Sequence, residues 1–160
     1  MVKKPKHEIR KDILSKAINP KLVFDKVKPL EDGFKIKVAD LGNACWTHYH
    51  FATEIQTRQY RGPEVILGSK YNTTADLWSI ACMTFEMLTG DLLFNPKRDQ
   101  NEIYGKNDDH IAQMMELLGI FPKKFSKRCS KFRKYFGPNC KLKRVPSLQQ
   151  WSIKDFMIAK

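Results

Sequence analysis

The sequence lacks the features that would assign it to a membrane, secreted or disulfide-rich class. No apolar run approaches the roughly 18 residues that a membrane span needs, and residues 1–6 lack the apolar stretch of a secretory signal. The four cysteines show no C-x-x-C spacing, and Cys82 lies within an apolar segment. We therefore expect a soluble, intracellular protein with reduced thiols and no membrane partner.

Acidic residues are scarce, and the charge is unevenly placed. The net charge is +12, with one basic block at residues 3–28 and a second at residues 123–144 that contains no acidic residue. The second block interleaves Phe125, Phe132, Tyr135 and Phe136, as single-strand nucleic-acid binders do. A solvated basic face over buried rings is the favoured interpretation. Direct nucleic-acid binding is kept as a less favoured alternative.

The domain organisation follows from where regular patterns begin. A length of 160 residues with 42% hydrophobic content suits one globular domain. Residues 1–32 are rich in lysine, contain Pro5, Pro20 and Pro29, and show little periodicity. They are predicted to be a basic linker or spacer remnant, and the ordered domain is predicted to cover residues 33–160.

The first chemical signal is an acid that follows an expected strand. Residues 34–38 alternate apolar and lysine side chains, which predicts a short half-buried strand, and Asp40-Leu41-Gly42 follows it. A carboxylate beside a glycine at a strand end can hold a divalent cation, because hard cations prefer oxygen ligands. Taken alone, the same tripeptide also predicts a simple turn.

A second motif indicates to which kind of site the first one belongs. Thr57-Arg58-Gln59-Tyr60-Arg61-Gly62-Pro63-Glu64 lies at the distance from Asp40 that separates the D-F-G and A-P-E motifs of protein kinases. Residues 38–46, Val-Ala-Asp-Leu-Gly-Asn-Ala-Cys-Trp, resemble the form found in SR-protein kinases. Both kinase motifs depart from the common pattern by one residue. The resemblance runs from about Lys35 to the C-terminus.

This resemblance implies a fold and a set of roles. The fold class is mainly α: part of a protein-kinase C-terminal lobe, with a short strand before the D-L-G motif. ATP and Mg²⁺ are the implied cofactors, and Asp40 is the implied ligand for the metal and its nucleotide. Thr57, Arg61 and Glu64 are implied to organise the activation segment. Glu64 normally pairs with a later arginine, which would come after Lys160.

A strongly apolar helix is expected next. Thr73-Thr74-Ala75-Asp76 predicts its start and Gly90 its stop, and apolar residues cover every side between them, which predicts burial all round. Local evidence makes Asp76 a capping acid. The resemblance implies that Asp76 also fixes the backbone of the catalytic loop. If the upstream half of the lobe were absent, this helix would leave apolar surface uncovered.

A second helix is predicted from Asp108 to Leu118. Ile111, Met114, Met115 and Leu118 form an apolar stripe, Gly119 marks the stop, and Asp109 and Glu116 lie on the other face, near Asp108. By resemblance this helix lines the groove in which SR-protein kinases dock arginine-rich substrates. Carboxylates suit that task because they form charge-assisted bonds with guanidinium groups. An ordinary solvated helix face is the alternative.

Three motifs of a working kinase do not occur before Asp40. They are the G-x-G-x-x-G loop, the lysine of the V-A-I-K type and the H-R-D-L-x-x-x-N loop with its catalytic base. The expectation is a partial kinase sequence, such as a gene-model fragment, that is inactive alone.

Three functional hypotheses follow. The favoured one is a serine/threonine kinase that phosphorylates Arg-Ser-rich splicing proteins, as a monomer in cytoplasm and nucleus. The others are a non-catalytic module that docks arginine-rich partners and a basic RNA-binding module.

Overall fold

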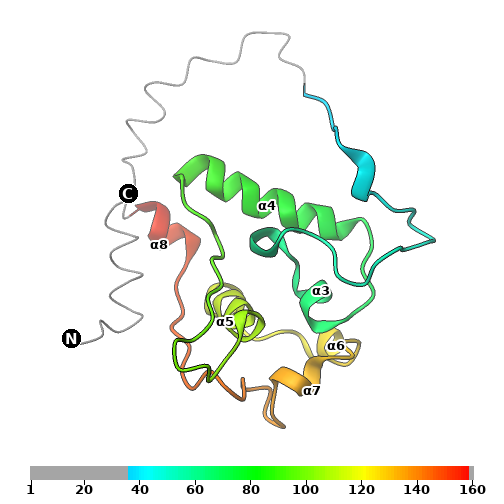
Figure 1. Ribbon diagram of the computed structural model, residues 1–160. Helices are drawn as coiled ribbons and strands as arrows, with labels where there is room; N and C mark the ends of the chain where they lie inside the picture. The colour runs from blue at the N-terminus through cyan, green and yellow to red at the C-terminus, as the bar shows by residue number, and fades with distance from the viewer. Residues whose placement is uncertain (1–35, 159–160) are drawn as a thin grey trace.

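A computed structural model describes residues 36–158 of the chain, and this part is helical (Figure 1). The predicted linker at residues 1–32 lies outside the described residues. None of the described helices is long and apolar enough to span a membrane. In chain order the helices are η1 (Leu41–Asn43), η2 (Arg58–Tyr60), α3 (Pro63–Leu67), α4 (Thr74–Thr89), α5 (Lys106–Leu118), α6 (Lys123–Ser126), α7 (Phe132–Tyr135) and α8 (Ile153–Ile158).

Helix α4 confirms the predicted apolar helix but not its predicted cap. The Thr73 side chain makes no capping bond. Instead, the Asn72 side chain accepts hydrogen bonds from the Thr74 backbone N–H (2.9 Å) and the Thr74 hydroxyl (2.6 Å). Asp76 is an exposed acid in the first turn, where the helix dipole favours negative charge. The helix ends at Gly90, as predicted, with the left-handed φ of 76° that glycine tolerates.

Helix α5 confirms the second predicted helix, and both of its ends are well defined. The Asp108 carboxylate accepts a hydrogen bond from the Gly105 backbone N–H at 3.2 Å and so closes the first turn. At the other end the Gly119 N–H donates to the Met115 carbonyl at 2.9 Å. Gly119 has a φ of 81°, which explains why the helix stops at this glycine.

The core lies between α3, α5 and the chain around α7. Its largest fully buried side chains include Leu67, Phe94, Ile111, Met114 and Tyr135. Figure 1 shows α5 beneath α4, with α3, α6 and α7 grouped on one side of it. Buried area on this scale stabilises the fold by roughly 1.5–3 kcal/mol for each large side chain.

A close approach at Gly68 joins α3 to the chain before α7. The Ser130 and Lys131 backbone N–H groups donate to the carbonyls of Gly68 (3.2 Å) and Leu67 (2.9 Å). Gly68 has a φ of 70°, and a Cβ at this position would lie 2.5 Å from the Ser130 hydroxyl oxygen. Only glycine therefore fits this junction without displacing its neighbour.

Two of the four cysteines behave as small hydrophobes. The cysteines of the described chain are free, and Cys82 and Cys129 are buried. Burial raises the pKa of each of these two thiols to about 11. At neutral pH both are therefore protonated, unreactive core residues.

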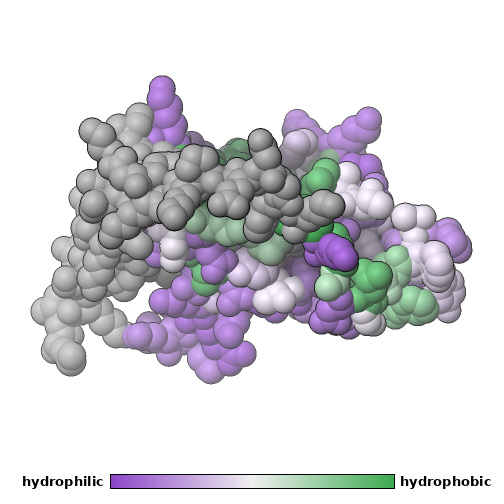
Figure 2. Space-filling model, turned by 90° about the horizontal axis from the view of Figure 1, so that it is seen from above, coloured by the Kyte–Doolittle hydropathy of each residue, from purple (hydrophilic) through white to green (hydrophobic). Residues whose placement is uncertain are grey.

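The prediction that α4 is buried on every side is wrong for the described structure. Ala75, Cys82 and Phe85 face the core, whereas Leu77 is 63% exposed and Met87 is 75% exposed. Ile80, Met83 and Leu88 are exposed as well. Figure 2, which views the molecule from above, shows green apolar side chains among purple hydrophilic ones. This outcome matches the companion expectation of uncovered apolar surface.

The predicted strand before Asp40 is not formed in the described part of the chain. Residues 34 and 35 lie outside the described residues, while Ile36 and Val38 are exposed and lie in irregular chain. A strand needs a partner for its backbone N–H and C=O groups. Within the described residues no neighbouring strand supplies one; the β-pairing there consists of two isolated bridges, Trp46 with Tyr49 and Phe136 with Leu142.

Candidate functional site: an anchored activation segment and a helix of buried carboxylates

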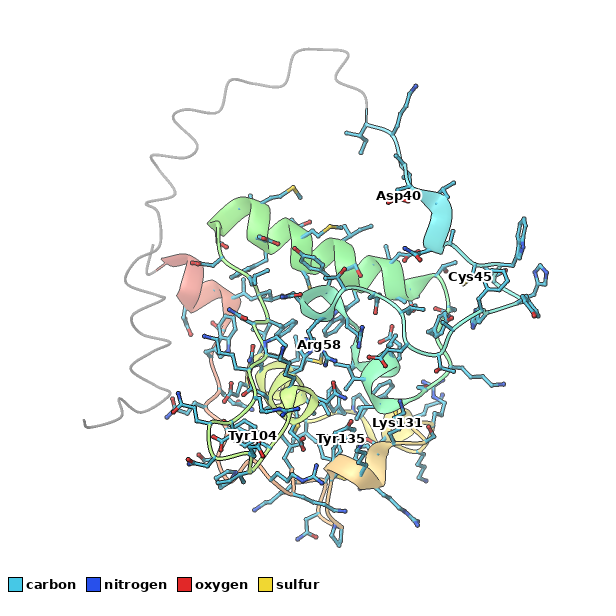
Figure 3. All side chains as sticks on the ribbon, viewed as in Figure 1. Asp40, Cys45, Arg58, Tyr104, Lys131 and Tyr135 are labelled. Atoms are coloured by element: carbon cyan, nitrogen blue, oxygen red, sulfur yellow. The ribbon has the colours of Figure 1, made fainter. Side chains whose placement is uncertain are left out.

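Asp40 stands at the start of the segment, in an unusual backbone conformation. Its φ of 58° and ψ of 64° are left-handed, which short acidic side chains tolerate better than most, and η1 follows directly. The residue is exposed. Figure 3 shows Asp40 on the side of the molecule away from Tyr135. The structure therefore presents this carboxylate to solvent and does not bring it against the other predicted site residues.

Gln56 anchors the middle of the segment to α4. Its side-chain amide donates to the Ala75 carbonyl (2.6 Å) and the Ser79 hydroxyl (3.0 Å), and its Oε1 accepts from the Gly62 N–H (2.9 Å). The residue has a φ of 68°, a strained value for a glutamine. Three hydrogen bonds to two separate stretches of chain hold it there. Gln56 thus joins the Gly62-Pro63-Glu64 turn to the first turns of α4.

Arg61 closes the same loop from the other side. Its Nη2 donates to the Gln56 carbonyl at 2.8 Å and its Nε to the same oxygen at 3.3 Å, while Nη1 pairs with the Glu54 carboxylate. The Arg61 side chain is largely buried. A guanidinium group supplies several donors in a fixed plane, so one side chain can tie these acceptors together.

Three more hydrogen bonds hold η2 against the described helices. The Tyr60 hydroxyl donates to the Glu86 carboxylate at 2.6 Å, which raises the pKa of Tyr60, and the Ser79 hydroxyl donates to the Tyr60 carbonyl at 3.0 Å. Arg58 donates to the Asn107 side chain on α5, and Asn107 donates to the Tyr135 hydroxyl at 3.0 Å. A chain of polar contacts therefore links the segment to both long helices.

Thr57 and Glu64 are the other residues predicted to organise the activation segment. The Thr57 side chain is exposed, and its carbonyl accepts a hydrogen bond from the Tyr60 N–H at 2.9 Å. Glu64 lies in the first turn of α3 and is half-buried. No ion pair to Glu64 forms among residues 36–158.

The three carboxylates predicted for docking are all on α5, and they are buried. Asp109 is 3% exposed and Glu116 is 7% exposed; Asp108 is buried too. The Asp109 carboxylate accepts from the Lys97 N–H (2.9 Å) and the Gln113 side chain (2.7 Å). Glu116 accepts from the Gln149 N–H at 3.3 Å, and Asp108 forms an ion pair with Arg144 at 3.3 Å. The structure therefore does not support the alternative of an ordinary solvated helix face for these three carboxylates, because they bind other segments of the chain. Their docking role stays a prediction.

His110 lies between these acids and the core. It is fully buried and packs against Phe94, with ring centroids 5.5 Å apart. Neither ring nitrogen has a hydrogen-bond partner among the described residues. Burial and, less strongly, the positive charges of Arg58 and Arg61 lower the pKa of His110 to about 4, although Asp109 opposes this shift. The imidazole is therefore neutral at physiological pH.

Sequence reasoning assigned roles to residues near both ends of this segment, which stay predictions, and overlooked one in its middle. It singled out Asp40, Thr57, Arg61 and Glu64 by motif, but not Gln56, which makes the contacts that join the segment to α4. Its only local signal is a polar residue within an otherwise unpatterned loop. A left-handed φ cannot be inferred from glutamine, because this residue type seldom adopts it.

The described residues could supply only some of the ligands of a metal ion, and other groups would have to supply the rest. Mg²⁺ usually takes one or two carboxylates and completes its coordination with water and substrate phosphates. Asp40 is exposed, and a glycine follows it two residues later, so its carboxylate is suited to be one such ligand. Within residues 36–158 no group of three or more His, Cys, Asp or Glu side chains is arranged to hold a metal.

Comparison with known protein families agrees with the arrangement of these motifs. The family model described as "protein kinase domain" matches residues 23–156. This match covers most of the chain, including the activation segment and α5. The chain therefore belongs to the protein kinase family.

Within that family the chain is similar to SR-protein kinases. It is 54% identical over 126 residues to the serine/threonine-protein kinase SRPK of Physarum polycephalum, covering 78% of this chain and 29% of the relative. It is 46% identical over 138 residues to SRSF protein kinase 3 of Mus musculus (84% and 24%). It is 48% identical over 122 residues to protein kinase dsk1 of Schizosaccharomyces pombe (76% and 22%). The chain thus spans about a quarter of the length of these curated relatives.

Proposed function

We propose that the chain serves in a serine/threonine protein kinase of the SR-protein type, which transfers the γ-phosphoryl group of ATP to serine in Arg-Ser-rich splicing proteins. The observation that carries this proposal is the fixed activation segment. Gln56, Arg61 and Tyr60 bind the segment to α4 through side chains of the chain itself. Phosphoryl transfer depends on positioning, so a segment held in one conformation is what the reaction requires.

The residues of the segment take different parts in this proposal. Asp40 would hold Mg²⁺, which bridges the phosphates of ATP and neutralises the charge that develops on them. Arg61 keeps the turn at Gly62 in place through the Gln56 carbonyl. Thr57 and Asp76 would contact the catalytic loop, whose motif does not occur in the printed sequence, and Glu64 would take an arginine partner.

Arginine-rich substrates would be recognised through Asp108, Asp109 and Glu116 on α5. Asp109 and Glu116 are seven residues apart, so they lie two turns apart on one face of the helix. Guanidinium groups bind carboxylates through strong charge-assisted hydrogen bonds. Because the described structure buries these acids, docking would require the chain near Lys97 or Gln149 to shift and share them.

The alternative functions receive less support. The RNA-binding hypothesis relied on aromatic rings between the basic residues, but Tyr135 and Phe136 are buried in the core, and Phe125 and Phe132 pack against it. A non-catalytic docking module would use the same α5 carboxylates and is distinguished only by the lack of phosphoryl transfer. A monomer that works in the cytoplasm and nucleus is part of the proposal.

The first test is Mg²⁺-ATP binding by calorimetry. The 160-residue chain would be compared with a form extended upstream to include any H-R-D loop that the gene encodes, each with and without Asp40→Asn. We expect binding in the extended form only, and its loss or strong weakening in the Asp40 variant. Tight binding by the 160-residue chain, unaffected by Asp40→Asn, would contradict the assigned role of Asp40.

A second measurement tests substrate recognition. Asp109→Asn with Glu116→Gln keeps the shapes of the side chains but removes their charges, so we expect an Arg-Ser repeat peptide to bind about tenfold more weakly. The matched control is Glu102→Gln with Asp155→Asn, two exposed acids outside this face. Unchanged affinity in the α5 variant would remove the docking role.

A further inference from the structure

A short hairpin follows α7 and is firmly attached to the core. Phe136 and Leu142 pair across it, and both side chains are buried. The Gly137 N–H donates to the Lys141 carbonyl at 2.9 Å and the Lys143 N–H to the Tyr135 carbonyl at 2.9 Å. These bonds hold the turn at residues 137–140 in a defined position beside α7.

The hairpin and α7 enclose a surface hollow of about 470 Å³. Its walls are mainly apolar: Phe132, Phe136, Pro138 and Cys140 line it, and Arg133 and Lys143 flank it. The two phenylalanine rings stack with their centroids 4.2 Å apart, which makes this side rigid. Its size is within the range of sites that take a small molecule or a large side chain.

The segment that contributes to the hollow, residues 123–144, is strongly basic and contains no acidic side chain. Residues 123–144 contain ten lysines and arginines and no acidic residue, and all ten basic residues are exposed. Among the described residues only Arg144 of this set forms an ion pair, with Asp108. The Lys143 ammonium group donates to the Arg133 carbonyl at 2.5 Å, which holds it at the rim of the hollow. The positive field of this surface is therefore largely uncompensated within the described chain.

None of the aromatic rings in residues 121–136 is fully exposed for stacking on nucleic-acid bases. Tyr135 and Phe136 are buried, and Phe121 and Phe125 pack on one another with centroids 5.5 Å apart. Single-strand binders combine basic grooves with exposed rings. Here the apolar element is instead a concave hollow, which suits a bulky side chain projecting from a peptide.

We propose that the hollow and its basic rim, formed by Arg133 and Lys143, are a docking site for an acidic peptide segment that carries one bulky apolar residue. The apolar residue fills the hollow, as anchor side chains do in peptide recognition. Carboxylates on either side pair with the rim cations and guide the encounter. This site is opposite in charge to the α5 carboxylates and does not depend on the proposed kinase function.

The test uses the purified 160-residue chain and fluorescence anisotropy. The probes are a labelled glutamate-rich peptide with one central tryptophan, the same peptide with glycine in its place, and single-stranded polyuridine RNA. We expect the tryptophan peptide to bind about tenfold more tightly than the glycine peptide, and more tightly than the RNA.

Two variants separate the charge from the hollow. Arg133→Glu with Lys143→Glu should abolish binding, whereas Lys37→Glu with Lys154→Glu, which changes the net charge equally but lies in the chain before η1 and in α8, should weaken it only slightly. Gly137→Leu should remove the preference for tryptophan, because a Cβ there meets only the Lys141 carbonyl, at 3.9 Å, and the position accepts a side chain. Circular dichroism checks that each variant folds.

Three results would overturn the proposal. One is equal binding of the tryptophan and glycine peptides, and another is loss of binding in both charge variants alike. The third is tighter binding of RNA than of either peptide, which would make this surface a nucleic-acid site.

Discussion

Helix α4 exposes several of its apolar side chains and helix α5 buries its acidic side chains, which is the reverse of what their compositions suggest. α4 has apolar side chains on every side, yet Leu77, Ile80 and Met87 are exposed. α5 carries Asp108, Asp109 and Glu116 and buries all three. The difference teaches that composition states what a helix can bury, whereas its neighbours decide what it does bury.

The neighbours of the two helices account for the reversal. α5 lies between α3 and the hairpin after α7, and its carboxylates accept N–H groups from segments that cross it at Lys97 and Gln149. Buried acids are tolerated when they are hydrogen-bonded in this way. α4 is covered on one side only, by the activation segment that Gln56 and Tyr60 bind to it and by core residues such as Phe94, which stacks on Trp78. The described chain places nothing comparable on its outer face.

The largest expected effect contrasts one methionine from each helix. Met114 on α5 is fully buried, so Met114→Ala should lower the free energy of unfolding by about 3 kcal/mol through lost packing and a new cavity. Met87 on α4 is exposed, so Met87→Ala should change the free energy of unfolding by less than about 0.5 kcal/mol. Urea denaturation measures both. Equal losses would mean that the outer face of α4 is covered in solution.

The next effect concerns the buried imidazole on α5. Burial lowers the pKa of His110 from 6.5 to about 4, so between these pH values the unfolded chain binds a proton that the folded chain does not. Stability should therefore fall as the pH drops from about 6.5 to about 4, by about 3 kcal/mol from this residue, and should be fully present above pH 6.5.

The measurement is the unfolding free energy of the chain at several pH values, compared with that of His110→Leu. The difference between the two proteins should change with pH across this window. An exposed histidine provides the control, and His48→Asn should leave the pH profile unaltered. A parallel profile for the wild type and His110→Leu would show that the imidazole is not buried as described.

A smaller effect is expected where α4 meets the activation segment. Gln56→Ala removes three hydrogen bonds, and we expect a loss of about 1–2 kcal/mol together with faster hydrogen exchange across residues 54–62. Gln59→Ala, which changes a half-buried glutamine in the same stretch, is the control. If both variants exchange alike, the segment is held by contacts other than those of Gln56.

The same contrast shows how far the sequence could predict the structure. Helix stops were predictable because Gly90 and Gly119 end apolar periodicity and adopt left-handed conformations. The cap of α4 was not, because Asn72, Thr73 and Thr74 are adjacent and each can cap. Periodicity also identified the buried stripe of Ile111, Met114 and Met115 on α5.

The candidate site divides in the same way. Motif spacing assigned chemical roles to residues of the segment from Asp40 to Glu64, and these roles stay predictions. The burial of Asp109 and Glu116 could not be predicted, because each accepts a hydrogen bond from the backbone N–H of a distant residue, which any sequence would supply. The role of Gln56 likewise depends on a backbone conformation that no local pattern indicates.

The smallest effect on stability, and the sharpest test of the contrast, comes from the outer face of α4. Leu77→Glu with Met87→Glu places charges on two exposed positions, so the unfolding free energy should change by less than about 0.5 kcal/mol. Self-association, followed by light scattering at rising concentration, should decrease, because exposed apolar surface promotes association. The same two charges on α5, at Ile111 and Met115, should instead prevent folding, because these side chains are buried and an unpaired charge there is costly. If the α4 variant lost as much stability as the α5 variant, the outer face of α4 would already be covered by a partner surface. The burial of α4 that its apolar composition suggests would then be correct.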